Sequence, residues 1–448
     1  MLGGFLLGLQ KRTERIPENM DTKKKTMLRP LTLLFCSLLL LVILSNYGAA
    51  AAQAPPPQPP PLPAEFGAQA AAMLPAFVDD VAQPEMWDRY SISAVLQPET
   101  QRLHGQMRLL VTNRSADQIE RLYFWLYPNH RDFGGRLDVT AARVAGVPVA
   151  SGTEQGDTLF WLALPRPLAP GVTTIVELSF TARTPRNASS RTFGAFNQEA
   201  GLWSLANFYP VLARYFLDSG WDRRILSSRG DFAVTATALY DVTIDVPASW
   251  QLVTTGVQVA NAPVAEGWRR ERFVSGPQRE FYLGATQGIE QVSSRVDGVR
   301  VVSHYQPGNA AAGRRALQWA EESLRQFNQR FGPYPLAEVE VVQGAMTTFL
   351  GMEYPGVVLI EQDLYWSSGR GLETTVVHEV AHQWWYSLVG NDAQGEAWID
   401  EGLASYAQVL YYEALGQPEL VRAELDAFRA LYRQARDRGN DRPLATPP

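Results

Sequence analysis

The chain has 448 residues, of which 46% are hydrophobic and 19% are charged. This composition excludes a disordered protein, and the length is sufficient for two or three globular domains with cores of their own. Residues 1–52 hold seven Lys or Arg and three Asp or Glu, so the remaining chain carries a net charge of −10 instead of −6, which argues against nucleic acid as a partner.

The first predicted segment, residues 1–54, is a signal peptide or a membrane anchor. Several lysines and Arg29 precede an apolar run over residues 31–44, and the alanines of residues 49–52 suit a signal peptidase. Cleavage near Ala52 is the favoured interpretation. The alternative is an uncleaved anchor over residues 31–52, because this run approaches the length that spans a bilayer. We therefore expect an exported protein, periplasmic or at the cell surface, or one anchored in the inner membrane by its leader.

Residues 55–77 are predicted to be a proline-rich linker. The run APPPQPPPLP over residues 54–63 favours an extended, semi-rigid spacer. The single cysteine, Cys36, lies before this run, in the leader. The mature chain is therefore predicted to have neither a disulfide bond nor thiol chemistry.

Residues 78–291 are predicted to form an N-terminal all-β domain. Apolar and polar residues alternate in segments such as 176–180 and 240–246, and this period of two is typical of half-buried strands. Residues 122–127 are apolar on both faces, as in a central strand. Turn clusters such as residues 113–115 separate these segments.

Residues 292–448 are predicted to form an α-rich domain, because the apolar period becomes helical after about Val292. In chain order we expect a helix that ends at Gly332-Pro333, strands over 338–343 and 357–360, a helix over 372–388, a helix around Glu401 that ends before Gly416, and a helix over 419–436. The helix around Glu401 is expected to turn four residues toward the core: Leu403, Ala407, Leu410 and Ala414. Three tryptophans are also assigned to the core: Trp384, Trp385 and Trp398.

The strongest functional signal is the H-E-x-x-H motif of His378, Glu379 and His382. Residues four apart on a helix lie above each other, so both imidazoles can bind one cation. Glu401 follows His382 after 18 residues, and two histidines with one glutamate leave the fourth position of a tetrahedral zinc open for water. The chain has only five histidines, so this motif arises by chance in roughly one such chain in several hundred. One zinc ion held by His378, His382 and Glu401 is therefore favoured over two core histidines beside a solvated glutamate.

Glu379 is predicted to be the general base. It is one residue from His378 and is turned from it by about 100° on the helix, so its carboxylate can sit beside the reacting water without binding the metal. We expect Glu379 to take a proton from this water and to pass it to the leaving amine. The alternative is a surface salt bridge.

Three stretches together resemble the zinc aminopeptidases of the aminopeptidase N and leukotriene-A-four hydrolase family, which are gluzincin metallopeptidases: GMEYPG over 351–356, HEVAHQWW over 378–385 and WIDEG over 398–402. The resemblance implies a saddle-shaped β-domain followed by a thermolysin-like catalytic domain, in a bacterial member of the family. The family carries a catalytic tyrosine on a helix downstream of the Glu401 helix. The resemblance therefore also implies that this sequence is truncated at its C-terminus and that its catalytic domain is incomplete, since three tyrosines of the Glu401 helix are poor substitutes: Tyr406, Tyr411 and Tyr412.

The resemblance assigns substrate binding to Gly351, Met352 and Glu353. Glu353 is expected to pair with the free α-amino group of a peptide, so that only the first peptide bond reaches the zinc. The chain departs from the family at Tyr354, where asparagine is the commoner residue, and the alternative for Glu353 is a loop carboxylate bonded to backbone amides. Asp400 is a candidate for orienting one of the metal ligands.

These observations predict a zinc-dependent aminopeptidase that acts on peptides with a free N-terminus. One alternative is a thermolysin-like endopeptidase, which also uses H-E-x-x-H and a glutamate. The other is a catalytically weak or non-catalytic relative that acts as a binding module, against which the intact ligands and Glu379 argue. Membrane association is expected only through residues 31–52, and the sequence does not predict the side-chain specificity or the oligomeric state.

Overall fold

The computed structural model describes residues 56–58, 68–185, 196–199, 201–225, 227, 234–346 and 349–444. The predicted leader, most of the proline-rich run and the last four residues lie outside these ranges. The chain divides into two units, Met1–Pro55 and Pro56–Pro448, and all described residues belong to the second. Within the described ranges, no helix has both the length and the apolarity that a membrane crossing requires.

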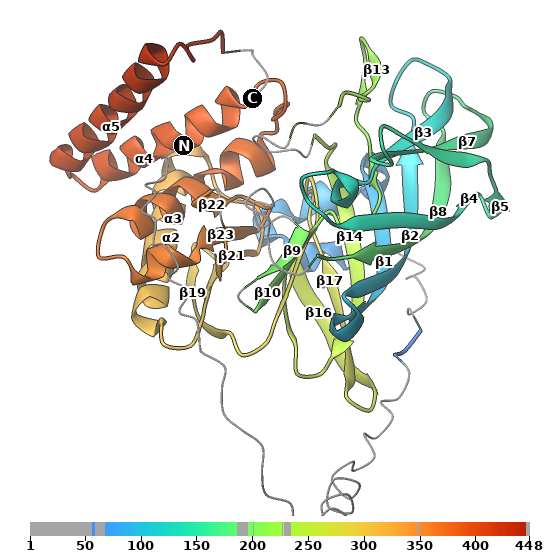
Figure 1. The fold of residues 1–448 in the computed structure, drawn as a ribbon, viewed down its shortest axis with the longest axis horizontal. Coiled ribbons are helices and arrows are strands. Elements are labelled where there is room, and N and C mark those ends of the chain that lie inside the picture. The colour runs from blue at the N-terminus through green and yellow to red at the C-terminus, as the bar shows by residue number, and fades with distance from the viewer. Residues whose placement is uncertain are drawn as a thin grey trace, which may run out of the picture. The chain divides into compact units, whose positions relative to one another are not determined.

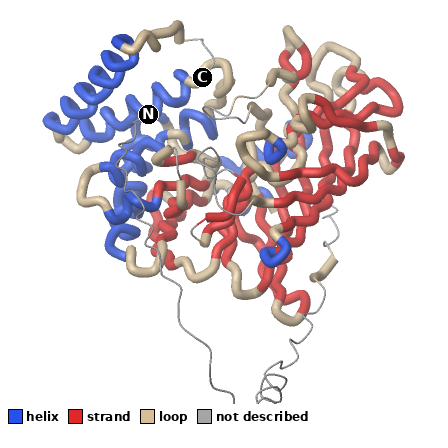
Figure 2. The backbone as a smooth tube through the Cα atoms, viewed as in Figure 1, coloured by secondary structure: helices blue, strands red, loops and turns tan. Residues whose placement is uncertain are grey.

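The N-terminal part of the described chain is built from β-sheets (Figures 1 and 2). Neighbouring strands of its largest sheet are antiparallel, except that β1 and β14 run parallel and set Ile92 beside Val242. Both residues belong to a core that this sheet shares with the smaller sheets. In order across the large sheet, the strands are β16 (Val257–Ala265), β17 (Trp268–Val274), β14 (Ala238–Pro247), β1 (Asp88–Gln97), β2 (Arg102–Thr112), β8 (Thr173–Arg183), β4 (Arg136–Val144) and β5 (Val147–Pro148).

Two smaller sheets and one hairpin complete this part. One sheet contains β15 (Gln251–Thr254), β18 (Tyr282–Thr286), β10 (Leu202–Ala206) and β9 (Phe196–Glu199). The other contains β11 (Val211–Leu212), β3 (Ile119–Trp125), β7 (Leu159–Leu168) and β6 (Ser151–Glu154), and the hairpin pairs β12 (Tyr215–Phe216) with β13 (Gly220–Trp221). Three short 3₁₀ helices precede β1: η1 (Gln69–Ala72), η2 (Pro75–Val81) and η3 (Pro84–Met86). Two others connect strands: η4 (Pro98–Thr100) lies between β1 and β2, and η5 (Tyr127–Asn129) between β3 and β4.

The C-terminal part combines a five-stranded sheet with the α-helices. Across the sheet the strands are β19 (Glu290–Val296), β20 (Val299–Tyr305), β21 (Glu338–Gly344), β23 (Val357–Glu361) and β22 (Gly351–Met352). The helical elements are α2 (Ala310–Phe331), η6 (Gln362–Trp366), α3 (Gly371–Ala381), the π-helix η7 (Gln383–Leu388), α4 (Trp398–Ala414) and α5 (Pro418–Asp437). The predicted fold class, an N-terminal all-β domain followed by an α-rich domain, is confirmed.

The interior strand β23 is buried on both faces, as its unbroken apolar sequence requires. Val357 and Leu359 pack into the core of the β-sheets, whereas Val358 and Ile360 pack against the helices. Helix α3 contacts both β23 and its neighbour β22. The sheet therefore holds the Gly351–Met352 strand at a fixed place beside the helix that carries the H-E-x-x-H motif.

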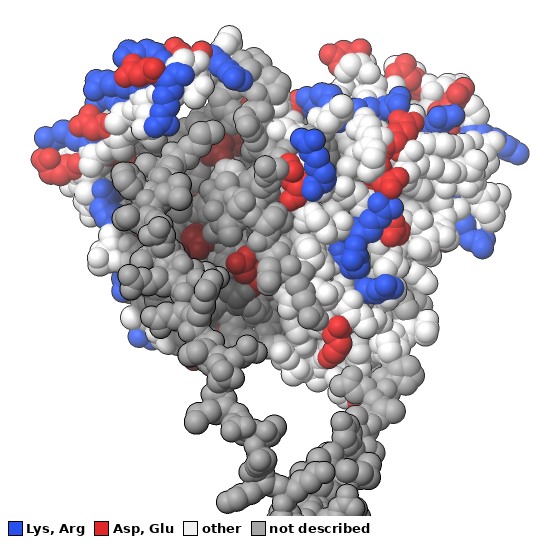
Figure 3. All heavy atoms as spheres, viewed as in Figure 1, with Lys and Arg blue, Asp and Glu red and all other residues white. Residues whose placement is uncertain are grey.

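Helix α5 is the most exposed of the α-helices. Glu424 is its one fully buried residue, and it forms an ion pair of 2.7 Å with Arg370 at the start of α3. Basic and acidic side chains are intermixed along this helix in Figure 3. Such exposed pairs contribute little to stability, so apolar contacts and the Arg370–Glu424 pair hold α5 in place.

The helical region begins later than the sequence pattern predicts. Residues from Val292 onward were expected to be helical, but the hairpin β19–β20 occupies residues 290–305 and α2 starts at Ala310. Strand β19 lies at the edge of the sheet, and Val296 is its one buried residue. Its sequence therefore lacks the strong alternation by which a strand is recognised.

Helix α3 ends at Ala381, and the prediction of a continuous helix to Leu388 is wrong. Beyond it, the backbone of Trp385 leaves the helical region, with φ −97° and ψ 64°. The amide of Ser387 donates to the carbonyl of His382 over five residues, which is the spacing of a π-helix. This turn directs the Trp385 carbonyl toward the His382 ring. The departure from the regular helix thus provides a hydrogen-bond acceptor for His382 Nδ1.

The predicted core side of α4 is confirmed at Ala407 but is wrong at Leu403 and Ala414, which are exposed. Ala404, Ala407 and Tyr411 are buried, whereas Leu403 is 39% exposed. The sequence carries two apolar stripes at helical spacing, and the small alanines allow the closer approach to α3. Trp398, at the start of α4, is 44% exposed, so its assignment to the core is also wrong. Of the other two tryptophans, Trp384 is buried and Trp385 is half-buried.

Candidate metal centre

The three predicted metal ligands come from two helices that pack together. His378 lies in the last turn of α3, His382 is the residue that follows α3, and Glu401 lies in the first turn of α4. Val376, Val377 and Val380 on the opposite side of α3 are buried in the helix–sheet core, which leaves the two histidines free to face α4. The packing of the apolar side thus sets the direction of the imidazoles.

The ligand atoms converge on one point. The Nε2 atoms of His378 and His382 are 3.1 Å apart, and Glu401 Oε2 lies 3.2 Å from His378 Nε2 and 3.9 Å from His382 Nε2. A tetrahedral zinc with bonds of about 2.0–2.1 Å separates its ligand atoms by roughly 3.3 Å. The spacing of the three side chains therefore fits a zinc ion.

The second nitrogen of each imidazole has its own acceptor. His378 Nδ1 lies 3.2 Å from Gln408 Oε1, and His382 Nδ1 lies 3.0 Å from the Trp385 carbonyl oxygen. Both acceptors place the ring proton on Nδ1, so the Nε2 lone pairs of the two rings face each other. A metal ion between the two neutral rings accepts both lone pairs and takes the place of the proton that His378 otherwise holds.

Gln408 is a positioning residue that the sequence analysis missed. Its Nε2 donates to the Thr374 carbonyl at 3.2 Å, which fixes the amide so that its oxygen faces His378. Such partners of metal ligands orient the ring and set its tautomer. The spacing contained the signal: Gln408 follows Glu401 by seven residues, close to two turns, and so lies on the same side of α4.

The site concentrates negative charge around the imidazoles. Burial by itself lowers the pKa of His378, but the hydrogen bond to Glu401 and the charge of Glu379 outweigh it and raise this pKa to about 9. Burial and the charge of His378 lower the pKa of His382 to about 4. Burial opposes ionisation of Glu401, yet the two histidines hold its pKa below the ordinary value, and half of this side chain is exposed. One positive charge is thus favoured at this point, and a bound cation supplies it.

All seven predicted site residues line one cavity of about 270 Å³, together with Phe349, Leu350, Thr374, Thr375 and Gln408. Glu353 and Glu379 are both buried, and their carboxylate oxygens and a ring nitrogen of His382 lie within 4.8 Å of one another. The cavity therefore offers a three-ligand set and, next to it, two further carboxylates.

Gly351 lies directly against Glu379. A Cβ atom at Gly351 would be 1.9 Å from Glu379 Oε1 and 2.2 Å from its Cδ. Only a residue without a side chain can occupy this position while the carboxylate keeps its place. Gly351 was predicted to bind substrate, and its geometry gives it a second task, to leave room for Glu379.

Gln383 connects the Glu353 segment to the metal-binding segment, and it too was missed. This side chain is buried between the two: Nε2 donates to the Tyr354 carbonyl at 3.3 Å, and Oε1 accepts from the Gly356 amide at 2.8 Å. The residue after His382 thus fixes the loop after Glu353. Tyr354 itself is buried and stacks on Tyr282, with ring centroids 4.4 Å apart.

Asp400 orients the start of α4, not an imidazole ring. Its Oδ1 accepts from the Glu401 amide at 2.9 Å. Burial raises the pKa of Asp400 to about 6. The ring nitrogens are instead oriented by Gln408 and by the Trp385 carbonyl.

Comparison with known proteins matches residues 315–442 to the peptidase family M1 domain. Aminopeptidase M1-D of Oryza sativa subsp. japonica is 28% identical over 187 residues, which cover 39% of this chain and 21% of that protein. Puromycin-sensitive aminopeptidase of Caenorhabditis elegans is 25% identical (40% and 20%), and human aminopeptidase B is 32% identical (28% and 19%). This chain therefore spans about a fifth of the length of these relatives.

Solved structures show a similar fold. The crystal structure of an M1 zinc metallopeptidase from Deinococcus radiodurans has a TM-score of 0.56 at 21% identity, over 80% of this chain and 77% of that one. A two-domain M1 zinc metallopeptidase mutant bound to L-arginine has a TM-score of 0.55 at 22% identity, over 74% and 71%. These similarities concern the fold and cover both the β-sheets and the helices.

Proposed function

We propose that this chain, whose residues 315–442 match the peptidase family M1 domain, is a zinc-dependent aminopeptidase of that family, which hydrolyses the first peptide bond of peptides with a free N-terminus. One observation carries the proposal: His378, His382 and Glu401 place three ligand atoms at zinc spacing, in the same cavity as Glu353 and Glu379. The activity, substrates and partners of the whole protein are part of this proposal.

His378, His382 and Glu401 would hold the zinc ion. When bound there, zinc supplies Lewis acidity, which polarises the substrate carbonyl and lowers the pKa of water toward neutrality. Gln408 and the Trp385 carbonyl keep both rings in the tautomer that presents Nε2 to the metal. The chain thus contributes a pre-arranged set of ligands, and the ion contributes its charge.

Glu379 would act as the general base. It points into the cavity beside the ligands and is separate from the His378–His382–Glu401 set. A buried carboxylate at this place can take the proton from the attacking water and deliver it to the leaving amine. Gly351 keeps the carboxylate in this position because it presents no side chain.

Glu353 would bind the α-ammonium group of the substrate. Its carboxylate lies within 4.8 Å of a ring nitrogen of His382, so an ammonium group bound there would be held close to the metal centre. A buried carboxylate that pairs with an ammonium group fixes the register of the peptide. This arrangement favours an aminopeptidase over an endopeptidase.

Matched substrates test the proposal. The purified protein would be given a fluorogenic aminoacyl amide and its N-acetylated form, before and after metal removal with a chelator and after zinc is added back. We expect turnover of the free amine alone, loss with chelator and recovery with zinc. Equal turnover of both substrates would indicate a thermolysin-like endopeptidase, and stoichiometric zinc without turnover would indicate a binding module.

We also propose that the protein is exported, as the pattern of residues 1–54 indicates. N-terminal sequencing of protein from fractionated bacterial cells tests this proposal. A mature N-terminus near Ala52 supports a cleaved signal peptide, and an intact leader in the membrane fraction supports an anchor. Full-length protein confined to the cytoplasm would contradict both.

A further inference from the structure

The segment between the two ligand-bearing helices has little regular structure of its own. It consists of the π-helix η7 and an irregular stretch over residues 389–397, which together connect His382 to Glu401. Within the stretch, backbone hydrogen bonds close one turn, from the amides of Gly395 and Glu396 to the Asp392 carbonyl. The distance between His382 and Glu401 is therefore set by the packing of α4 on α3 and by contacts that reach the segment from outside.

Arg279 contacts both parts of this segment, the π-helix η7 and the irregular stretch that follows it. It precedes β18 in the β-sheet part of the chain and is 2% exposed. Its Nη2 donates to the Asn391 carbonyl at 2.9 Å and its Nη1 to the Tyr386 carbonyl at 3.4 Å. The guanidinium also lies 4.5 Å from the centre of the Tyr386 ring, and a Cβ at Gly390 would be 3.2 Å from Arg279 Nε.

The two carbonyls, of Tyr386 and Asn391, belong to backbone that leads to the metal ligands His382 and Glu401. The carbonyl of Trp385, the residue before Tyr386, accepts from His382 Nδ1. On the other side, the Asn391 side chain donates at 3.3 Å to the Glu396 carbonyl, which also accepts from the Ile399 amide in the first turn of α4, near Glu401. One guanidinium thus bridges the backbone next to His382 and the loop that leads to Glu401.

The surroundings of Arg279 make the bridge rigid. The Tyr386 hydroxyl donates to Glu280 Oε1 at 2.6 Å, and the Asn207 amide donates to Glu280 Oε2 at 2.8 Å. The Tyr386 ring therefore lies between a buried guanidinium and a buried carboxylate of opposite charge. Such a layer of hydrogen-bonded, desolvated groups has one favourable arrangement, and displacing any member leaves a buried polar group without its partner.

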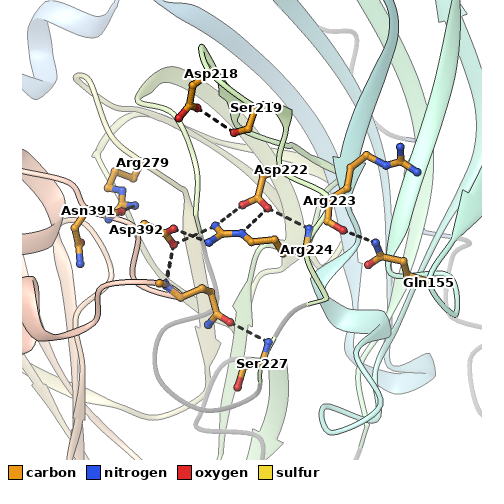
Figure 4. A network of polar contacts seen from close by, with 12 residues as sticks. Gln155, Asp218, Ser219, Asp222, Arg223, Arg224, Ser227, Arg279, Asn391 and Asp392 are labelled. Carbon is orange, nitrogen blue, oxygen red and sulfur yellow. Dashed lines mark hydrogen bonds and ion pairs between the residues drawn. The ribbon is translucent and has the colours of Figure 1, made fainter. Parts of the chain in front are cut away.

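Arg224 holds the same loop from its more exposed side. Figure 4 shows Arg224 between Asp222 and Asp392, and Arg279 beside Asn391. Arg224 donates to both oxygens of each carboxylate at 2.6–3.1 Å. This clamp fixes the loop near Asp392, whereas Arg279 joins the loop to η7.

We propose that Arg279 is a positioning residue for the metal centre: through the carbonyls of Tyr386 and Asn391, it sets the separation of His382 from Glu401. The inference rests on the zinc site of the proposed function. It gives the β-sheet part of the chain a direct effect on metal affinity. Arginine is required because its planar fork donates in two fixed directions, which a lysine ammonium cannot reproduce.

The test compares Arg279→Lys with Arg272→Lys. Arg272 makes a forked pair with buried Asp241, at 2.9 and 2.6 Å, within the large β-sheet and so serves as a matched control. Zinc affinity would be measured by competition with a chromogenic chelator, and ligand geometry by the visible spectrum of the cobalt(II)-loaded protein. We expect Arg279→Lys to bind zinc about 10- to 100-fold more weakly and to change the cobalt spectrum, with neither change in the control.

Unaltered zinc affinity and an unaltered cobalt spectrum in folded Arg279→Lys would overturn the proposal. So would a loss of affinity that follows the loss of stability equally in both variants. If Arg279→Lys does not fold, Gly390→Ala replaces it, because the added methyl group presses on the guanidinium and should weaken zinc binding; normal binding there would also overturn the proposal. Neither measurement uses substrate, so failure of the proposed activity and failure of this inference are distinguishable.

Discussion

Gly351→Ala tests whether the position of Glu379 controls the reaction. The new Cβ would lie 1.9 Å from Glu379 Oε1, whereas Cβ atoms in proteins rarely come within 3.0 Å of another heavy atom. The carboxylate or the β22 backbone must therefore move by about 1 Å. Misplacement of a catalytic group by about 1 Å can cost about 10²-fold in rate, or about 2.7 kcal/mol in the activation free energy.

The assay follows kcat on a fluorogenic aminoacyl amide together with the zinc content of each variant. Zinc should remain stoichiometric in Gly351→Ala, because the atoms that the new Cβ would strike belong to Glu379 and not to a ligand. Gly402→Ala is the matched control, since it adds a methyl group next to Glu401 where nothing lies within 4 Å. We expect a loss of kcat of about 10²-fold in the first variant and little change in the second.

Two results would refute this reasoning. A Gly351→Ala protein with the kcat of the wild type would show that the carboxylate has more room than the structure gives it. A protein that loses zinc together with activity would show that Gly351 supports the ligands and not the base. Either result would also weaken the assignment of Glu379.

Three further predictions concern the centre, and one concerns the fold. His382→Ala should remove most of the zinc, as measured by elemental analysis, and full occupancy would contradict the ligand set. Glu379→Gln should retain zinc and reduce kcat by about 10²- to 10⁴-fold, and metal loss would mean that its role is structural. Glu353→Ala should raise KM for free aminoacyl amides more than for any residual cleavage of N-acetylated ones, and equal losses would contradict an amine-binding role. Burial and the charge of Glu340 raise the pKa of Glu338 to about 8 from an ordinary value of 4.5. The folded protein therefore favours protonated Glu338, and the free energy of unfolding falls as the pH rises from about 4.5 toward 8. In urea titrations Glu338→Gln should lose stability less steeply than the wild type between about pH 5 and pH 8, by up to about 1.4 kcal/mol per pH unit, and parallel profiles would contradict this shift.

Sequence patterns predicted those features of the site that depend on neighbours along the chain. The pairing of His378 with His382 follows from one helical turn, and the α3 residues on the other side are apolar enough to define the buried face. The fold class likewise follows from local periods of two and of 3.6 residues. These are statements about one element at a time, and the structure supports them.

Features that depend on contacts between elements could not be predicted in this way. Leu403 was assigned to the core because it has helical spacing with Ala407 and Leu410, yet it is exposed and the smaller Ala404 is buried instead. Periodicity identifies apolar stripes but does not decide between two of them when the partner surface is unknown. The end of α3 at Ala381 depends in the same way on an interaction that no propensity contains, the bond from His382 to the Trp385 carbonyl.

The distance between His382 and Glu401 is a feature of the site that patterns along the chain do not determine. A motif states that 18 residues lie between His382 and Glu401, but a chain of that length can span many distances. Here the distance between their ligand atoms is 3.9 Å, because Arg279 and Arg224 hold the connecting segment from the β-sheet part. The identity of the ligands is therefore encoded within the helices. Their geometry also depends on Arg224 and Arg279, which lie far before the motif in the sequence and belong to the β-sheet part.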